Sequence, residues 1–213
     1  MKHEPLRIGP LALPGELVLV PGALGLVVFV HGSGSSRLSP RNQQVAGWLN
    51  QHRLATLLFD LLTEAEADDR RNVFDIALLS RRVGEALDAL HRRDDTRHLP
   101  LGLFGASTGA AAALCAAAAH PATVAAVVSR GGRPDLAGEH LVLVRAPTLL
   151  IVGGDDTEVL ALNRAALHQL VCSQRLEVVP GATHLFEEGG ALEQVAKLAA
   201  AWFAEHLGAV LQP

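Results

Sequence analysis

The sequence has 213 residues, of which 49% are hydrophobic and 19% charged, and its formal net charge is −4. This composition is typical of a folded globular protein and excludes a disordered chain. The length fits one domain, residues 1–213. Because the charge is slightly acidic and no basic run occurs, we expect no nucleic-acid partner.

The chain gives no sign of a membrane, metal or disulfide protein. No apolar run approaches the ~20 residues of a spanning helix, and the segment Met1 to Pro5 carries an acid and a proline where a signal peptide is apolar. The cysteines, Cys115 and Cys172, form no CxxC pattern, and none of the ten histidines lies in an HExxH pattern. We expect a cytoplasmic protein without metal or other cofactor, as a monomer or small homo-oligomer.

Short apolar runs alternate with segments of helical periodicity, which predicts an α/β fold with a mostly parallel sheet and helices on both faces. At the start, Leu6 to Leu13 and Glu16 to Val20 flank Pro14 and Gly15, which predicts an antiparallel edge hairpin turning there. The predicted parallel strands are Leu26 to Val30, Ala55 to Phe59, Leu101 to Phe104, Val124 to Val128, Thr148 to Val152 and Leu176 to Val179. The predicted helices are Pro40 to His52, Asp75 to Arg93, Thr108 to His120, Glu158 to Leu170 and Ala191 to Leu207.

The most informative motif is the G-x-S-x-G pentapeptide Gly105 to Gly109, which lies between a predicted strand and an alanine-rich predicted helix. A serine on such a strand-to-helix turn points its hydroxyl out of the C-terminal edge of the sheet, and the tight turn needs glycine on either side. The alternative is an ordinary helix N-cap. The strand-turn-helix context favours Ser107 as a nucleophile.

A serine nucleophile needs a base and an acid, which should follow in the order serine, acid, histidine. His184 follows the last predicted strand, one strand after an acidic turn and two after the motif, which favours it as the general base. Asp135, Asp155 and Asp156 all follow strands that could present them at the same edge. The residues alone therefore leave the acid open among these three.

An oxyanion hole needs two N–H donors aimed at the developing charge. One donor is expected from the backbone of Thr108, the residue after the nucleophile. The other is expected from the loop His31 to Ser36, which directly follows the first parallel strand. A Gly/Ser loop could bind phosphate instead, but this one lacks the Gly-Lys-Ser/Thr of a P-loop and the spaced glycines of a dinucleotide fingerprint.

Three further segments, His31 to Asn42, Ser129 to Asp135 and Gly181 to Phe186, resemble the dienelactone-hydrolase-like branch of the α/β-hydrolase superfamily. The resemblance extends from about Leu26 to the final helix, and it implies a small esterase without a substantial cap. The dienelactone hydrolases themselves use a cysteine at the nucleophile elbow, the strand-to-helix turn of the G-x-S-x-G motif, whereas this chain has Ser107 there. A general ester is therefore the expected substrate rather than dienelactone.

The resemblance also implies which residues complete the site. Gly153, Asp156 and Val159 are in register with the family's G-x-x-D-x-x-V turn, which favours Asp156 as the acid that orients the histidine. The His-Gly-x motif points to the amide of Ser33 as the second oxyanion donor, with Gly34 as second choice.

We therefore predict a serine hydrolase that cleaves small carboxylic esters through an acyl-enzyme. Thioester hydrolysis or acyl transfer would use the same residues, and a non-catalytic binding protein of this fold is the alternative from another class. Only residues 129–147 separate the fourth and fifth parallel strands, where caps are commonly inserted in this family. We expect an open site that prefers short acyl chains.

Two arginines, Arg130 and Arg37, are candidates for binding a carboxylate on the substrate. Arg130 follows a predicted strand directly, and Arg37 and Arg41 follow the oxyanion loop at the same edge of the sheet. Planar guanidinium groups grip carboxylates through paired hydrogen bonds. The alternative is that these arginines pair with surface acids such as Asp135 or Glu139.

Overall fold

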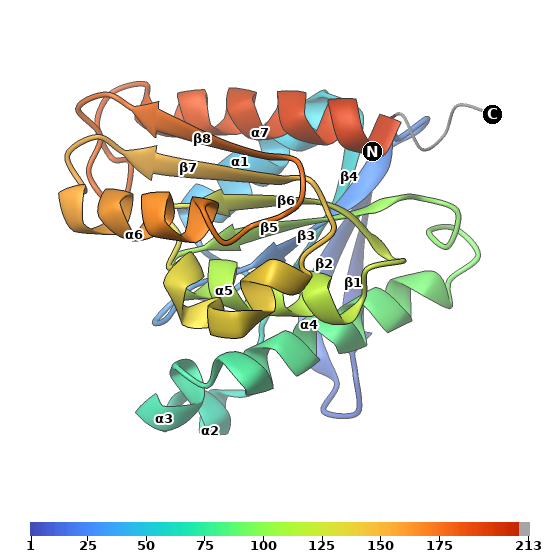
Figure 1. The fold of residues 1–213 in the computed structure, drawn as a ribbon. Helices are drawn as coiled ribbons and strands as arrows, with labels where there is room; N and C mark the ends of the chain where they lie inside the picture. Colours follow the sequence, from blue (N-terminus) through green and yellow to red (C-terminus); the bar gives the residue numbers. More distant parts are fainter. Residues whose placement is uncertain (209–213) are drawn as a thin grey trace.

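The computed structural model describes residues 1–208, which fold around one eight-stranded sheet (Figure 1). The strands are β1 (Lys2–Ile8), β2 (Leu13–Leu19), β3 (Gly25–Val30), β4 (Leu54–Phe59), β5 (Leu101–Ala106), β6 (Val124–Arg130), β7 (Thr148–Gly153) and β8 (Gln174–Val179). Their order across the sheet is β1-β2-β4-β3-β5-β6-β7-β8. β2 is antiparallel to both of its neighbours, β1 and β4, and the six strands β3 to β8 pair in parallel, so the predicted mostly parallel sheet is confirmed.

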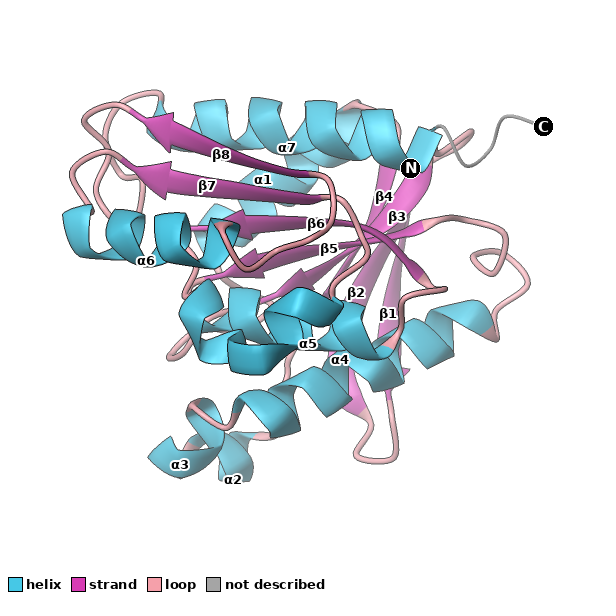
Figure 2. Ribbon diagram, viewed as in Figure 1, coloured by secondary structure: helices cyan, strands magenta, loops and turns pink. Residues whose placement is uncertain are grey.

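Helices cover both faces of the sheet (Figure 2). One face carries α1 (Pro40–Gln51) and α7 (Ala191–Gly208), and the other carries α4 (Ile76–His91), α5 (Thr108–Ala119), α6 (Thr157–Leu167) and the 3₁₀ segment η1 (Pro134–Leu143). Two short helices that the sequence did not predict, α2 (Glu64–Ala67) and α3 (Arg70–Val73), precede α4. Within residues 1–208, no helix is long and apolar enough to cross a membrane, and no three His, Cys, Asp or Glu side chains form a metal-binding cluster.

The central strands are buried on both faces, which explains their continuous apolar sequences. Every residue of β3, β4, β5 and β7 is buried. Along β3, Val28 and Val30 belong to the core under α4 and α5, whereas Val27 and Phe29 belong to the core under α1 and α7. This alternation is what a strand between two helical layers requires.

The predicted position of the N-terminal turn is wrong. The chain reverses between Gly9 and Ala12, where the N–H of Ala12 donates to the carbonyl of Gly9 at 3.1 Å. Pro14 and Gly15 lie inside β2. A Cβ at Gly15 would be 3.2 Å from the Cβ of Phe59 in β4, so this glycine marks a close approach of two strands instead of a turn.

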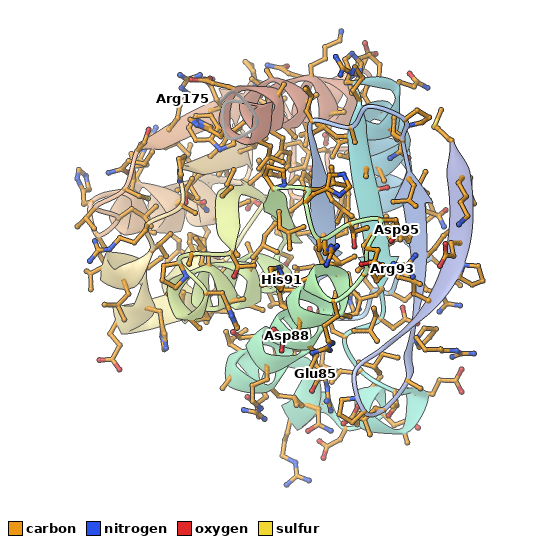
Figure 3. The ribbon with its side chains drawn as sticks, turned by 90° about the vertical axis from the view of Figure 1, so that its right-hand side faces the viewer. Glu85, Asp88, His91, Arg93, Asp95 and Arg175 are labelled. Atoms are coloured by element: carbon orange, nitrogen blue, oxygen red, sulfur yellow. The ribbon has the colours of Figure 1, made fainter. Side chains whose placement is uncertain are left out.

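Ion pairs connect the C-terminal side of α4 to the edge strand β1. The guanidinium of Arg93 pairs with Asp95 at 2.8 Å and with Glu4 of β1 at 2.9 Å. Figure 3 shows Arg93 and Asp95 beside each other, past His91 at the end of α4. Single pairs at this exposure stabilise little, and β1 is held chiefly by its backbone pairing with β2, to which this one cation adds a contact with two carboxylates.

Close packing of α7 on the sheet predicts opposite effects for two glycine substitutions. A Cβ at Gly102 of β5 would lie 2.7 Å from Cε1 of Phe203, whereas a Cβ at Gly47 of α1 meets no neighbouring atom of residues 1–208 within 4 Å. We predict that Gly102→Ala lowers the free energy of unfolding by ~1–3 kcal/mol through overpacking. Gly47→Ala should raise it by ~0.5–1 kcal/mol through helix propensity. Urea unfolding measures both, and a shift in the same direction for the two variants would contradict this account.

Candidate active site

Ser107 alone forms the turn between β5 and α5, and its backbone is strained. Its φ of 51° and ψ of −124° lie outside the regions that L-residues normally adopt. Three backbone hydrogen bonds hold this conformation: the N–H of Ser107 donates to the carbonyl of Arg130 at 3.2 Å, and its carbonyl accepts from Ala110 at 3.1 Å and Arg133 at 3.0 Å. The serine is thereby fixed at the C-terminal edge of the sheet.

The glycines on either side of Ser107 have no space for a side chain. A Cβ at Gly105 would lie 2.4 Å from the backbone of α5, and a Cβ at Gly109 would lie 2.2 Å from the carbonyl oxygen of Val30. The loop after β3 is similarly close, because a Cβ at Gly32 would be 3.0 Å from the Cβ of Ser107. These contacts bring the predicted oxyanion loop against the elbow.

The structure brings Ser107, His184 and Asp156 together. Nδ1 of His184 is 2.7 Å from Oδ2 of Asp156, and Nε2 is 3.4 Å from Oγ of Ser107. With the ring N–H on Nδ1 donating to this carboxylate, Nε2 is placed to accept from the serine hydroxyl. The Nε2–Oγ distance of 3.4 Å is at the long end of the hydrogen-bond range.

Of the three acids that the residues left open, Asp156 is the one that faces His184. Its side chain is 14% exposed. Asp156 occupies the N-cap position of α6 but makes no capping hydrogen bond, so its oxygens are free for the imidazole. Asp155 is exposed, and Asp135 pairs with Arg133 at 2.7 Å.

Backbone contacts hold the turn 153–156, which carries Asp156, against the loop 179–184, which carries His184. The N–H of Gly154 donates to the carbonyl of Val179 at 2.8 Å, and the N–H of Asp155 donates to the carbonyl of Ala182 at 3.0 Å. A Cβ at Gly153 would lie 2.2 Å from that same Ala182 oxygen, so only glycine permits this approach. The separation of Asp156 and His184 is therefore set by the main chain.

The two predicted oxyanion donors lie beside each other. Thr108 is the first residue of α5, so its N–H has no acceptor within the helix and lies at the positive end of the helix dipole. The N–H of Ser33 donates to the side-chain Oγ1 of Thr108 at 2.9 Å. The sequence did not predict this hydrogen bond. An oxyanion that binds both amides must take the place of the Thr108 hydroxyl as the acceptor for Ser33.

His31 holds the oxyanion loop in place, a role that the sequence analysis did not assign. It is buried, its Nε2 accepts a hydrogen bond from the N–H of Leu61 at 3.1 Å, and its Nδ1 donates to the carbonyl of Gly32 at 3.0 Å. Burial lowers the pKa of His31, which keeps the ring neutral. Its position at the end of β3, just before the Gly/Ser loop, is the signal that could have identified it.

A cavity of about 320 Å³ lies between the oxyanion loop and the loop after β4. Its lining includes Ser33 and the apolar side chains of Leu61, Leu62, Val73 and Leu79. The helices α2 and α3 therefore form part of its wall.

The structure places Arg37 and Arg130, the two candidates for binding a substrate carboxylate, in different surroundings. Arg37 also lines the cavity, and its guanidinium and backbone N–H both bind the carboxylate of Asp60, the latter at 2.7 Å. Arg130 is 7% exposed and contacts the side-chain oxygen of Asn42 at 3.5 Å. Arg37 thus already has an acid partner, as the alternative interpretation expected, although the partner is Asp60.

No family model matches the sequence. Among solved structures, a dienelactone hydrolase from Anabaena variabilis is 56% identical, with a TM-score of 0.92, and the match covers 96% of this chain and 97% of that one. The chain belongs to the dienelactone hydrolase family. The resemblance inferred from the three sequence segments is therefore confirmed. Because the match spans nearly the whole of both chains, the chain has no large cap.

More distant structures share the fold. Est1E from Butyrivibrio proteoclasticus is 16% identical with a TM-score of 0.81, covering 97% of this chain and 99% of that chain. A dienelactone hydrolase-like promiscuous phosphotriesterase from metagenomic libraries is 20% identical with a TM-score of 0.76, covering 96% of this chain and 98% of that one. Both matches span nearly the whole of each chain, so the likeness is one of fold.

Curated relatives carry a different name. Two strains of Mycobacterium tuberculosis have a protein, provisionally named a phosphoribosyl transferase, that is 58% identical over 209 residues. The match covers 97% of this chain and 47% of each relative, so the chain spans about half the length of the curated relatives it matches.

The buried neutral His31 predicts a loss of stability in mild acid. Its pKa in the folded state lies below the ordinary value of 6.5, so the unfolded chain binds the proton more readily and the free energy of unfolding falls as the pH drops below 6.5. His31→Gln keeps an acceptor for Leu61 but cannot titrate. We predict that this variant loses less stability than the wild type between about pH 7.5 and about pH 5.5.

Chemical unfolding at the two pH values measures the effect, with the exposed His98→Gln as the control that should follow the wild type. If His31→Gln declines as steeply as the wild type, the buried ring does not control acid stability.

Proposed function

We propose that the protein is a serine hydrolase that cleaves small carboxylic esters. The observation that carries the proposal is the continuous hydrogen-bonded chain from Asp156 through His184 to the strained Ser107 in a hydrolase fold. Oγ of Ser107 attacks the ester carbonyl carbon while Nε2 of His184 takes its proton. The ester C–O bond then breaks, and the alcohol leaves with that proton, which produces the acyl-enzyme.

Water completes the reaction in the same geometry. His184 takes a proton from the water that attacks the acyl carbon, and Ser107 leaves with the proton as the acid is released. Asp156 stays ionised and stabilises the imidazolium in both steps. The amides of Thr108 and Ser33 hold the oxyanion, and a single donor of this kind contributes ~2.7–4 kcal/mol to the transition state.

The chain's cysteines support serine as the nucleophile, although dienelactone hydrolases themselves use cysteine at the elbow. Cys115 is buried within α5, and burial raises the pKa of its thiol to about 11. A thiol in that state supplies almost no thiolate near neutral pH. The hydroxyl of Ser107, activated by His184, is the nucleophile that the geometry supports.

The cavity beside the oxyanion loop suits a small substrate group. Its volume of about 320 Å³ is near the lower end for ligand pockets. Leu61, Val73 and Leu79 supply apolar parts of a lining that also includes Arg37, Asp60 and Glu64. We place the acyl group of the ester there, next to Ser33. Short acyl chains should therefore be preferred, and the absence of a large cap gives no lid that lipid surfaces could open.

Hydrolysis is a better proposal than phosphoribosyl transfer for this chain. The relatives with the transferase name are about twice its length, and their name applies to the whole protein. The dienelactone hydrolase from Anabaena corresponds to the present chain over 97% of its own length. The Asp156, His184 and Ser107 chain of hydrogen bonds is the arrangement that acyl chemistry uses.

The acid assignment gives a matched test of this proposal. Asp156→Asn should lower kcat for 4-nitrophenyl acetate by about 10⁴, because the histidine loses the partner that holds its tautomer. Asp155→Asn, at the exposed neighbouring position, is the matched control and should lower kcat less than about tenfold. Ser107→Ala should abolish acyl-enzyme formation while the circular dichroism spectrum stays unchanged. Near-normal turnover by Ser107→Ala would refute the proposed function, and equal losses for the two aspartates would refute the role of Asp156.

A further inference from the structure

Strand β8 is an open edge of the sheet. It is last in the strand order, and Gln174, Arg175 and Val178 are exposed, whereas every residue of the neighbouring strand β7 is buried. The opposite edge strand, β1, contains Pro5, and proline in an edge strand hinders pairing with a further strand. β8 contains no proline. The two edges of the sheet therefore differ in how readily another strand can pair with them.

The backbone of β8 directs three residues toward its free side. The carbonyls of Ser173 and Val179 each accept a hydrogen bond at 2.8 Å from an N–H at the start of β7 or just past its end. Because successive residues of a strand direct their backbone groups to opposite sides, Gln174, Leu176 and Val178 point their N–H and C=O groups away from β7. Within residues 1–208 no strand lies on that side. These groups form a row with which a further strand can pair.

The side chains of β8 place one charge of each sign on the same face. Arg175 and Glu177 are two positions apart, so they share a face with Val179, which belongs to the core under α7. The guanidinium carbon of Arg175 lies 5.4 Å from the ring of Trp202 in α7. Among residues 1–208, neither Arg175 nor Glu177 has an ion-pair partner within 4.0 Å. Both charges are therefore available to a partner at this edge.

We propose that β8 pairs in antiparallel fashion with β8 of a second copy of this chain, about a two-fold axis that passes through Leu176 perpendicular to the sheet. Such an axis keeps every side chain on its own face and uses the same surface of both copies. Leu176 then lies opposite Leu176 of the second copy, and Gln174 lies opposite Val178. The outward N–H and C=O groups of all three residues gain partners, and the two sheets become continuous.

The charges of β8 select this register. With the axis at Leu176, Arg175 of each copy lies directly opposite Glu177 of the other. Moving the axis by one residue places either two Arg175 or two Glu177 side chains opposite each other. Opposite charges in facing cross-strand positions stabilise a strand pair, whereas like charges destabilise it. A protective edge would carry charges of one sign, which repel in every register, but β8 carries one of each.

Sedimentation of the full chain over a concentration series tests the pairing. The wild type should form a dimer with twice the mass of the chain. Glu177→Arg and Arg175→Glu each place two pairs of like charges opposite each other, so each should raise the dissociation constant of the dimer by about tenfold or more. The double variant Arg175→Glu/Glu177→Arg restores two pairs of opposite charge and should return the dissociation constant to near the wild-type value.

Two further variants separate pairing of β8 from a general effect of charge. Asp88→Arg makes the same change of charge as Glu177→Arg at an exposed position of α4, on another side of the molecule from Arg175 (Figure 3), and should leave the dissociation constant unchanged. Val178→Pro removes an outward N–H without removing a bond to β7, and should weaken the dimer by about tenfold or more. Circular dichroism checks that each variant keeps the fold.

Hydrogen exchange identifies the paired strand directly. The amides of Gln174, Leu176 and Val178 should exchange more slowly at protein concentrations above the dissociation constant than below it, because pairing removes them from water. The amides of β1, at the opposite edge of the sheet, should exchange at the same rate at both concentrations.

A chain that stays monomeric at millimolar concentration would overturn the proposal. A dimer that resists both Glu177→Arg and Val178→Pro would also overturn it, because its interface would lie elsewhere. Failure of the double variant to recover would overturn the register centred on Leu176. The pairing goes beyond the proposed hydrolysis, and none of these measurements needs turnover. Absence of esterase activity would therefore refute the proposed function alone.

Discussion

The strained backbone of Ser107 is the constraint on which the rest of the site depends. A single residue turns the chain from β5 into α5, and this is possible because Gly105 and Gly109 have no side chains where the backbones of α5 and β3 approach. The same turn leaves the first N–H of α5 free and places the serine hydroxyl 3.4 Å from His184. The proposed nucleophile, one proposed oxyanion donor and the contact with the proposed base thus follow from one backbone conformation.

Around Ser107, the surroundings of each titratable side chain set its partner or its charge. His31 is held neutral by burial and ties the oxyanion loop to the loop after β4. Asp156 makes no capping bond in α6 and contacts His184 instead. Arg130 keeps its charge beneath the same edge without an acid partner among the described residues. The paired acid and base are the part of the site on which the proposed hydrolysis depends.

The sequence predicted what depends on local pattern and missed what depends on distant contacts. Continuous apolar runs identified the parallel strands, because both faces of the sheet are covered. Pro14 and Gly15 misled the hairpin prediction, since the glycine is required by its contact with Phe59 in another strand. The hydrogen bond from Ser33 to the hydroxyl of Thr108 joins residues 75 positions apart, and the contact of Arg130 with α1 spans 88 positions. No spacing rule predicts such pairs.

The central claim is that His184 activates Ser107 as a covalent nucleophile, and labelling with a fluorophosphonate followed by peptide mass spectrometry tests it most directly. The account predicts one adduct, on Ser107, that forms in the native wild type and is strongly reduced in His184→Ala and after unfolding. An unlabelled Ser107 in the folded protein, or labelling that proceeds equally well without His184, would contradict it.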